Sequence, residues 1–237
     1  MPLRAPRRPA LIAASVALVC AAAPAAASAR IVEVGQAPTE AVPTCPASPC
    51  LAVSRTTGYQ AKVVDSRARY VVPANGRIVA FSIRLGAPNK RQIKFFEDNF
   101  GTPSTARISV LRRGTTRKHR LDHRLIAQSD TFELDRYFGS KPTFVFDKPI
   151  PVKKGNWIAI TVPTWAPILA TNVAHTNWWR SSRPKDSCLP PKSLRQFAME
   201  TLRQVNQFGC TYSGANAARL LYTVTYVPSN HITNPSG

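Results

Sequence analysis

From Tyr59 onward, short apolar runs are separated by Gly, Pro and Asn, a pattern typical of strands and turns. Within residues 69–85, the apolar segment Tyr70–Val72 leads into Asn75-Gly76, which is a two-residue turn signal. Beyond that turn, large apolar side chains alternate with smaller or polar ones, as in a strand with one buried face. The segment predicts a β-hairpin whose second strand directs four side chains into the core: Val79, Phe81, Ile83 and Leu85.

Similar runs predict further strands along the chain. They are centred on Ile108 and Val110, and on residues 125–127, 144–146, 158–162 and 219–227. In the last of these, Tyr222, Val224 and Tyr226 share one face. The strongly basic segment 113–124 lies between the first two, and we interpret it as the solvated loop of a hairpin.

Residues 193–205 are ambiguous. Their apolar positions fit helical spacing, which would make this segment the only helix. The alternative is an irregular loop, which we prefer because Pro190-Pro191 precedes it and no helical partner is evident. Short strands at regular spacing with almost no helical pattern predict an all-β fold, a jelly-roll-like antiparallel β-sandwich.

The first 29 residues have the pattern of a signal peptide. Arg4, Arg7 and Arg8 precede the uncharged run Leu11–Ala23, and Ala27-Ser28-Ala29 supplies the small residues of a cleavage site. Two other kinds of export signal fit these residues less well. A twin-arginine signal is disfavoured because Pro9 follows the arginine pair, and lipidation of Cys20 is disfavoured because a better cleavage site follows.

We therefore expect a secreted protein, extracellular or associated with the cell wall. No stop-transfer pattern follows the apolar run, so we expect no transmembrane segment in the mature chain. The expected organisation is a signal peptide over residues 1–29, a Pro-rich lead-in over 30–50, one β-sandwich domain over 51–230 and a tail over 231–237.

Charge points to anionic partners. Removal of the leader lowers the 32 Lys+Arg to 29 against 12 Asp+Glu, a net charge of +17. Such a surface attracts polysaccharides or other envelope polymers that carry negative charge, and it attracts nucleic acid only non-specifically. The structural alternative is a well-solvated basic surface without a particular partner.

Four cysteines remain in the mature chain, an even number that predicts two disulfides in an exported protein. Cys45 and Cys50 enclose a turn-forming Pro-Ala-Ser-Pro segment, which leaves Cys188 to pair with Cys210. A zinc site is disfavoured because no short Cys-x-x-Cys spacing is present and no histidine lies close in sequence. We expect neither a metal nor a cofactor.

Two segments resemble recurrent parts of exported actinobacterial jelly-roll domains. They are residues 70–78 (YVVPANGRI) and residues 149–158 (PIPVKKGNWI), and the resemblance extends over about residues 60–165. Those domains are similar to carbohydrate-binding modules and lectin-like sandwiches. The matching residues form turns and core, so the resemblance implies a fold and no activity.

Residue patterns for catalysis are weak. A Gly-x-Ser-x-Gly nucleophile motif is absent from the sequence. His119 and His123 lie in a cationic stretch that would repel a metal, so we expect solvated loop histidines. Carboxylates cluster at residues 130–135 and at Glu97-Asp98; they are typical of turns and charge balance, and the alternatives are a glycan hydrolase or, for residues 97–101, a Ca²⁺ site.

Tryptophans offer the best candidates for ligand contact. Trp165 lies between two prolines, which predicts a loop, and the adjacent pair Trp178-Trp179 predicts one buried and one exposed ring. An exposed indole beside polar side chains can stack on a sugar ring or an organic cation. The candidate contacts are Trp165, Asn177, Trp178, Trp179 and Arg180. The structural alternative, which we prefer for the pair, is that both rings pack over the sandwich edge.

These observations favour a secreted, non-catalytic β-sandwich that binds a glycan or an anionic envelope polymer. The alternatives are an exported hydrolase that uses carboxylates and a structural surface protein without a small ligand.

We predict that the secreted product begins at Arg30 and has no free thiol, because a cleavage site precedes Arg30 and the cysteine count is even. Intact mass measured before and after reduction and alkylation tests both statements. A retained leader, or a cysteine that is alkylated without reductant, would contradict them.

Overall fold

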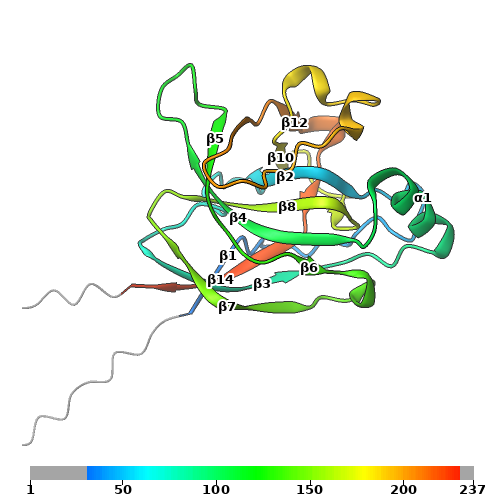
Figure 1. Ribbon diagram of the computed structural model, residues 1–237, viewed down its shortest axis with the longest axis horizontal. Helices are drawn as coiled ribbons and strands as arrows, with labels where there is room; N and C mark the ends of the chain where they lie inside the picture. The colour runs from blue at the N-terminus through cyan, green and yellow to red at the C-terminus, as the bar shows by residue number, and fades with distance from the viewer. Residues whose placement is uncertain (1–30, 230–237) are drawn as a thin grey trace, which may run out of the picture.

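The computed structural model describes residues 31–229, so the predicted leader and the tail over 231–237 lie outside the described residues. Two antiparallel sheets face each other across the main core (Figure 1). The four-stranded sheet has the order β1 (Val32–Val34), β14 (Tyr222–Pro228), β3 (Gly76–Ile83) and β7 (Thr143–Val152). β1 lies within the expected lead-in and pairs with β14, so the sheet begins earlier than the sequence pattern indicated.

The larger sheet has eight strands. Its order is β11 (Val205–Gln207), β5 (Asp122–Gln128), β4 (Thr105–Arg113), β8 (Trp157–Ala166), β2 (Val53–Lys62), β10 (Trp178–Ser181) and β12 (Cys210–Tyr212), with β6 (Phe132–Glu133) paired to β4. A small third sheet joins β9 (Leu169–Ala170) to β13 (Arg219–Leu220). The all-β prediction is thus confirmed.

Alternation places the main core between the sheets. Ile158, Ile160 and Val162 of β8 pack against Val224 and Tyr226 of β14, as their spacing predicted. The strands predicted at residues 125–127 and 144–146 are also present, within β5 and β7. Residues 114–121 connect β4 to β5 as a hairpin loop, which is shorter than the predicted 113–124 because Arg113 and residues 122–124 belong to the two strands.

The predicted hairpin at Asn75-Gly76 is wrong. β3 pairs with β14 and β7, whereas Val71 forms a bridge with Trp157 at the start of β8. The chain therefore crosses from one sheet to the other at Asn75-Gly76. Gly76 is required because a Cβ there would collide with the backbone oxygen of Val227.

The buried side chains of β3 also depart from strict alternation. Phe81, Ile83 and Leu85 are buried as predicted, but Val79 is only half-buried. The register of β3 against β7 shifts between Ile78 and Ala80, and Ile78 is fully buried. A β-bulge places two residues opposite one, so it changes which side chains face the core.

Helical structure occurs where the sequence analysis did not expect it. Helix α1 (Lys90–Phe100) begins with a capping box between Asn89 and Gln92 and packs Phe96 against β8. The segment 193–205 is not an α-helix, in agreement with the preferred alternative. Short 3₁₀ turns occur at η1 (Asp135–Tyr137), η2 (Lys185–Ser187), η3 (Lys192–Leu194) and η4 (Gly214–Asn216).

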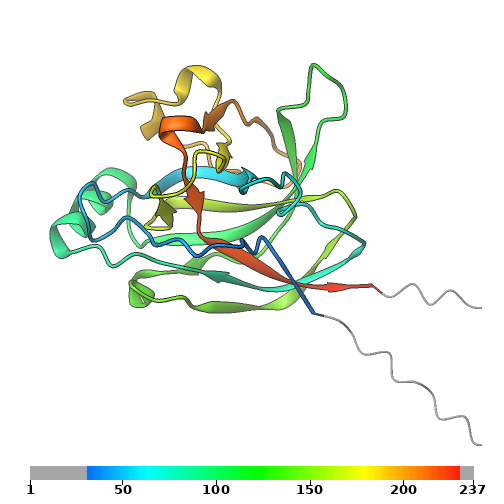
Figure 2. The ribbon, with the colours of Figure 1, turned by 180° about the vertical axis from the view of Figure 1, so that it is seen from behind.

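A long excursion, residues 182–209, connects β10 to β12, covers the outer face of the larger sheet and contributes β11 at its far edge (Figure 2). The Cys188–Cys210 disulfide closes the excursion, and Cys45–Cys50 closes the small loop before β2, so both predicted pairings are confirmed. None of the helices within the described residues is long and apolar enough to cross a bilayer.

Phe81→Ala should lower the free energy of unfolding by about 3–5 kcal/mol, the cost of deleting a buried aromatic ring. Phe81 is fully buried and stacks on Phe144 of β7. Val145→Ala, on the exposed side of the same strand pair, is the control and should change stability by less than about 0.5 kcal/mol. Urea unfolding measures both; equal effects would contradict the assigned register.

Candidate functional site

Trp165 is a core residue. It lies within β8, opposite Ser54 of β2, and its side chain is fully buried. Its ring stacks on Phe96 of α1 with centroids 4.9 Å apart. The loop predicted from the flanking prolines is therefore wrong, and Trp165 holds the helix on the sheet rather than contacting a ligand.

Trp178 and Trp179 point to opposite faces of β10, as expected for adjacent strand residues. Trp179 is buried and stacks on Tyr212 of β12, with ring centroids 4.1 Å apart. Asn177 is also buried, and its amide Nδ2 donates to the backbone oxygen of Ala174 at 2.9 Å. Among the predicted contact residues, only Trp178 and Arg180 keep part of their side chains accessible.

The ring of Trp178 is surrounded by cations of the chain itself. Lys62 Nζ lies 5.3 Å and the Arg67 guanidinium carbon 4.6 Å from its ring centroid. Its indole Nε1 donates to the backbone oxygen of His175 at 3.2 Å. A sugar that stacked on this ring would compete with these cation–π contacts. The ring of Trp178 is therefore not a free surface for stacking on a neutral sugar.

Arg180 lies at the centre of a cluster of arginines. Its Nη1 donates to the backbone oxygen of Phe208 at 3.0 Å, which fixes the guanidinium on the excursion. Burial lowers the pKa of Arg180 below its ordinary value, and the charges of Arg113, Arg120 and Arg67 act in the same direction. Guanidinium groups from β10, the β4–β5 loop and the segment after β2 thus converge on one surface.

The β4–β5 hairpin supplies two of the cations of this surface. Arg113 Nε donates to the backbone oxygen of Arg120 at 2.7 Å, which closes the loop between them. The acidic side chain of the loop, Asp122, accepts from His119 Nδ1 at 2.6 Å. We name the convergent side chains the basic patch: Lys62, Arg67, Arg113, Arg120, Trp178 and Arg180. Within residues 31–229, none of its five cations forms an ion pair.

Like charges also oppose each other at the base of the hairpin. Arg112 and Arg124 are directly paired in the β4–β5 register, and both are exposed. Opposed like charges destabilise a strand pair, and a bound anion would relieve that repulsion. Both line a concave surface beside the basic patch, together with Arg113 and His119.

His123 forms the floor beneath the patch. The expectation that it is a solvated histidine is wrong, because it shares the buried face of β5 with Leu125 and contacts Tyr59 and Phe208, with ring centroids 5.0 and 4.7 Å away. Its Nδ1 donates to the backbone oxygen of Leu121 at 3.0 Å. Burial lowers its pKa to about 4, and the nearby Arg113 and Arg180 contribute to this.

The candidate catalytic carboxylates do not converge. Asp98 pairs with Lys94 on α1 at 3.0 Å, and Asp135 accepts from the backbone nitrogen of Ser104 at 3.1 Å. Burial raises the pKa of Asp135. The four concave surfaces that we compared each have at most one carboxylate in the wall. Among the described residues, no group of three His, Cys, Asp or Glu could hold a metal ion.

Comparison of the chain with protein-family models, with curated proteins and with solved structures gave no match. Function is therefore inferred from the geometry and charge of the surfaces described above.

The buried His123 predicts loss of stability at acidic pH. Its pKa of about 4 in the folded protein lies below the ordinary 6.5, so the unfolded chain binds the proton more tightly. The free energy of unfolding should fall as the pH drops from 6.5 toward 4, by about 3 kcal/mol in total from this residue.

Urea unfolding of the native protein and His123→Phe across this pH window measures the effect. His123→Phe retains an aromatic ring among its aromatic neighbours and should show a smaller decline. His119→Gln, which changes the exposed histidine, should decline as the native protein does. Identical profiles for the native protein and His123→Phe would contradict the assignment.

Proposed function

We propose that this is a secreted, non-catalytic β-sandwich protein of jelly-roll type that binds an anionic envelope polymer through the basic patch. The observation that carries the proposal is that Trp178 holds Lys62 and Arg67 over its ring, two residues before Arg180, and that within residues 31–229 none of the patch cations forms an ion pair. Arginines held so close repel one another, and a polyanion would neutralise them together.

The nature of the patch favours an anionic polymer over a neutral glycan. Guanidinium groups bind phosphate, sulfate or carboxylate oxygens through two parallel N–H donors. The ring of Trp178 orients Arg67 and Lys62 instead of offering a free face. Arg112 and Arg124 add positive charge on the opposite face of the same hairpin, where they line a concave surface with Arg113.

Export is supported by two independent features. The sequence predicts a signal peptide over residues 1–29, and disulfides persist mainly in oxidising compartments. In the envelope, a positively charged protein meets polymers of repeating negative charge, which is the chemistry that the patch is suited to bind.

The test uses the mature protein with poly(glycerol phosphate) as the anionic probe and dextran as the neutral one. Binding to poly(glycerol phosphate) should be saturable and should weaken as salt rises, because bound counterions are released. The double variant Arg67→Gln/Arg120→Gln removes two patch cations and should reduce the slope of log affinity against log salt by about one per arginine.

The matched control is Arg77→Gln/Arg136→Gln, which removes the same charge from exposed positions outside the patch. Its salt slope should stay close to that of the native protein. Trp178→Ala should weaken binding less than the patch double variant, because it acts only by releasing Arg67 and Lys62. Equal losses in the patch and control variants would show a non-specific basic surface, and tight dextran binding would favour a neutral-glycan module.

A further inference from the structure

A second concave surface, of about 780 Å³, is separate from the basic patch. We name it the apolar groove. Its wall comes from α1, the segment around the Cys45–Cys50 loop, β10, β12 and the excursion. α1 and the excursion stand in the same half of the molecule in both views (Figures 1 and 2). The volume lies in the range of small-molecule sites.

The wall is dominated by apolar side chains. Trp179 and Tyr212 form one side through their stacked rings, and the remaining apolar contacts come mainly from Leu51, Val53, Phe95, Phe100, Leu189 and Leu194. Phe95 and Leu189 are 58% and 75% exposed, so they present apolar surface at the mouth of the groove.

Only one charged side chain lines the wall, that of Arg183. Its Nη1 and Nη2 donate to the backbone oxygens of Arg195 and Ser54 at 3.0 and 2.7 Å. The guanidinium thus ties the excursion to β2 and forms a fixed part of the wall. No carboxylate belongs to the described lining, so the groove combines apolar walls with positive charge.

Arg55 adds a cation at the rim. Its Nη1 donates to the backbone oxygen of Leu194 at 3.1 Å, and its guanidinium lies 6.0 Å from the ring centroid of Phe100. Leu194 and Phe100 both line the groove, so Arg55 stands at its edge. Within residues 31–229, Arg55 forms no ion pair.

The backbone directs Arg55 to this place at a cost. Arg55 has φ of 45°, in the left-handed region that L residues seldom adopt, and the β2–β8 register shifts between Ser54 and Thr56. A bulge of this kind re-aims a side chain, and such strain is concentrated at functional sites. The sheet is interrupted at the residue that brings positive charge to the groove.

We propose that the apolar groove binds a fatty-acid carboxylate, with its aliphatic chain along the Trp179–Leu189 wall and its carboxylate at Arg55. Charge complementarity carries the choice of an anionic head, because within residues 31–229 the rim cation Arg55 has no acidic partner and the described wall has no carboxylate. Two disulfide-closed segments border the groove, so the site is preformed and binding requires little ordering. This proposal does not depend on the function of the basic patch.

Calorimetric titration of the mature protein with dodecanoate, below its micelle concentration, tests the proposal. Binding should saturate at one molecule per chain and show a negative heat-capacity change, the mark of apolar burial. Leu189→Glu and Phe95→Glu should each weaken it by about tenfold or more, because they place a charge in the apolar wall beside the bound chain. Leu202→Glu is the matched control: Leu202 is 57% exposed but lies outside the described lining, and its variant should bind normally.

The head group is tested separately. Arg55→Gln should weaken dodecanoate by about threefold and leave the neutral analogue dodecanol unchanged, and Arg55→Lys should restore part of the difference. Arg67→Gln/Arg120→Gln, in the basic patch, should bind dodecanoate as the native protein does, which separates this site from the proposed polymer site.

Four results would overturn the proposal. These are the absence of saturable binding, equal loss in Leu202→Glu, equal affinity of the native protein for dodecanol and dodecanoate, and a dimer in sedimentation that Phe95→Glu abolishes. The last result would identify a second copy of the chain as the occupant of the groove.

Discussion

The structure depends on a seam of hydroxyl groups buried on the outer face of the eight-stranded sheet. Thr57 of β2, Thr161 of β8 and Ser109 of β4 are fully buried and linked side by side, Thr161 Oγ1 lying 2.8 Å from Thr57 Oγ1 and 2.6 Å from Ser109 Oγ. The hydroxyls bond one another, which avoids the cost of about 1–3 kcal/mol for a buried hydroxyl without a partner, but they are kept from water only by a segment that covers the sheet. The central strands therefore need cover on both faces.

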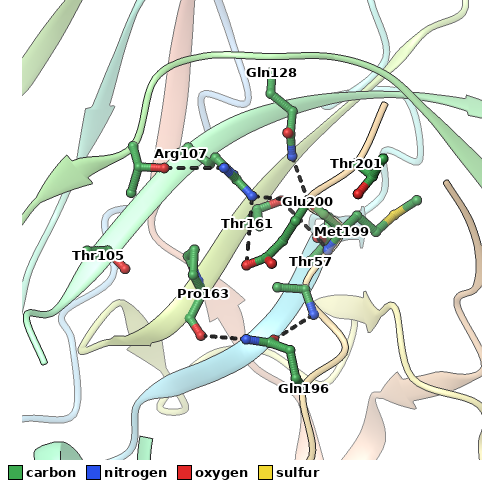
Figure 3. Close-up of polar contacts among 12 residues, drawn as sticks. Thr57, Thr105, Arg107, Gln128, Thr161, Pro163, Gln196, Met199, Glu200 and Thr201 are labelled. Carbon is green, nitrogen blue, oxygen red and sulfur yellow. Dashed lines mark hydrogen bonds and ion pairs between the residues drawn. The ribbon is translucent and has the colours of Figure 1, made fainter. Parts of the chain in front are cut away.

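The excursion provides that cover through matched polar contacts. The backbone nitrogen of Met199 donates to Thr57 Oγ1 at 2.9 Å, and Gln128 Nε2 donates to the backbone oxygen of Met199 at 2.6 Å (Figure 3). Gln196 Nε2 reaches the backbone oxygen of Pro163 at 3.1 Å, and Arg107 approaches Glu200 at 3.9 Å. An irregular segment is thus held in one conformation by side chains of three strands and by a backbone oxygen of a fourth.

Both proposed sites follow from this arrangement, because the same excursion borders each of them. On one side, the backbone oxygen of Phe208 fixes Arg180 at the centre of the basic patch. On the other, Arg183 and Leu189 form the wall of the apolar groove. The Cys188–Cys210 disulfide limits the freedom of the unfolded excursion, a contribution of about 3 kcal/mol in the chain-entropy description. Without the seam and the disulfide, neither wall would be rigid.

Alternation predicted the inner core well because β8 and β14 each bury large side chains at every second position. Alternation failed on the outer face of the larger sheet. Ser109 and Thr161 are polar, which predicts exposure to solvent, but the excursion buries them. Trp165 was misplaced for a related reason: its prolines suggested a loop, yet the strand continues through Pro163 to Ala166. A signal for α1 was present in the Asn89–Gln92 capping box, but the helix is mostly polar and buries only Phe96.

The sequence predicted several residues of the candidate site, but it did not predict that they lie close together. The sequence identified Trp178, Arg180 and the basic loop as separate features, and only the strand order β5–β4–β8–β2–β10, with the excursion above it, brings them together. Arg112 opposite Arg124 and the left-handed Arg55 in a bulge each violate a local rule of stability. A sequence that tolerates such violations away from binding sites would lose stability without compensation. Their concentration beside two concave surfaces is the pattern expected when a bound anion or an apolar chain supplies the missing contacts.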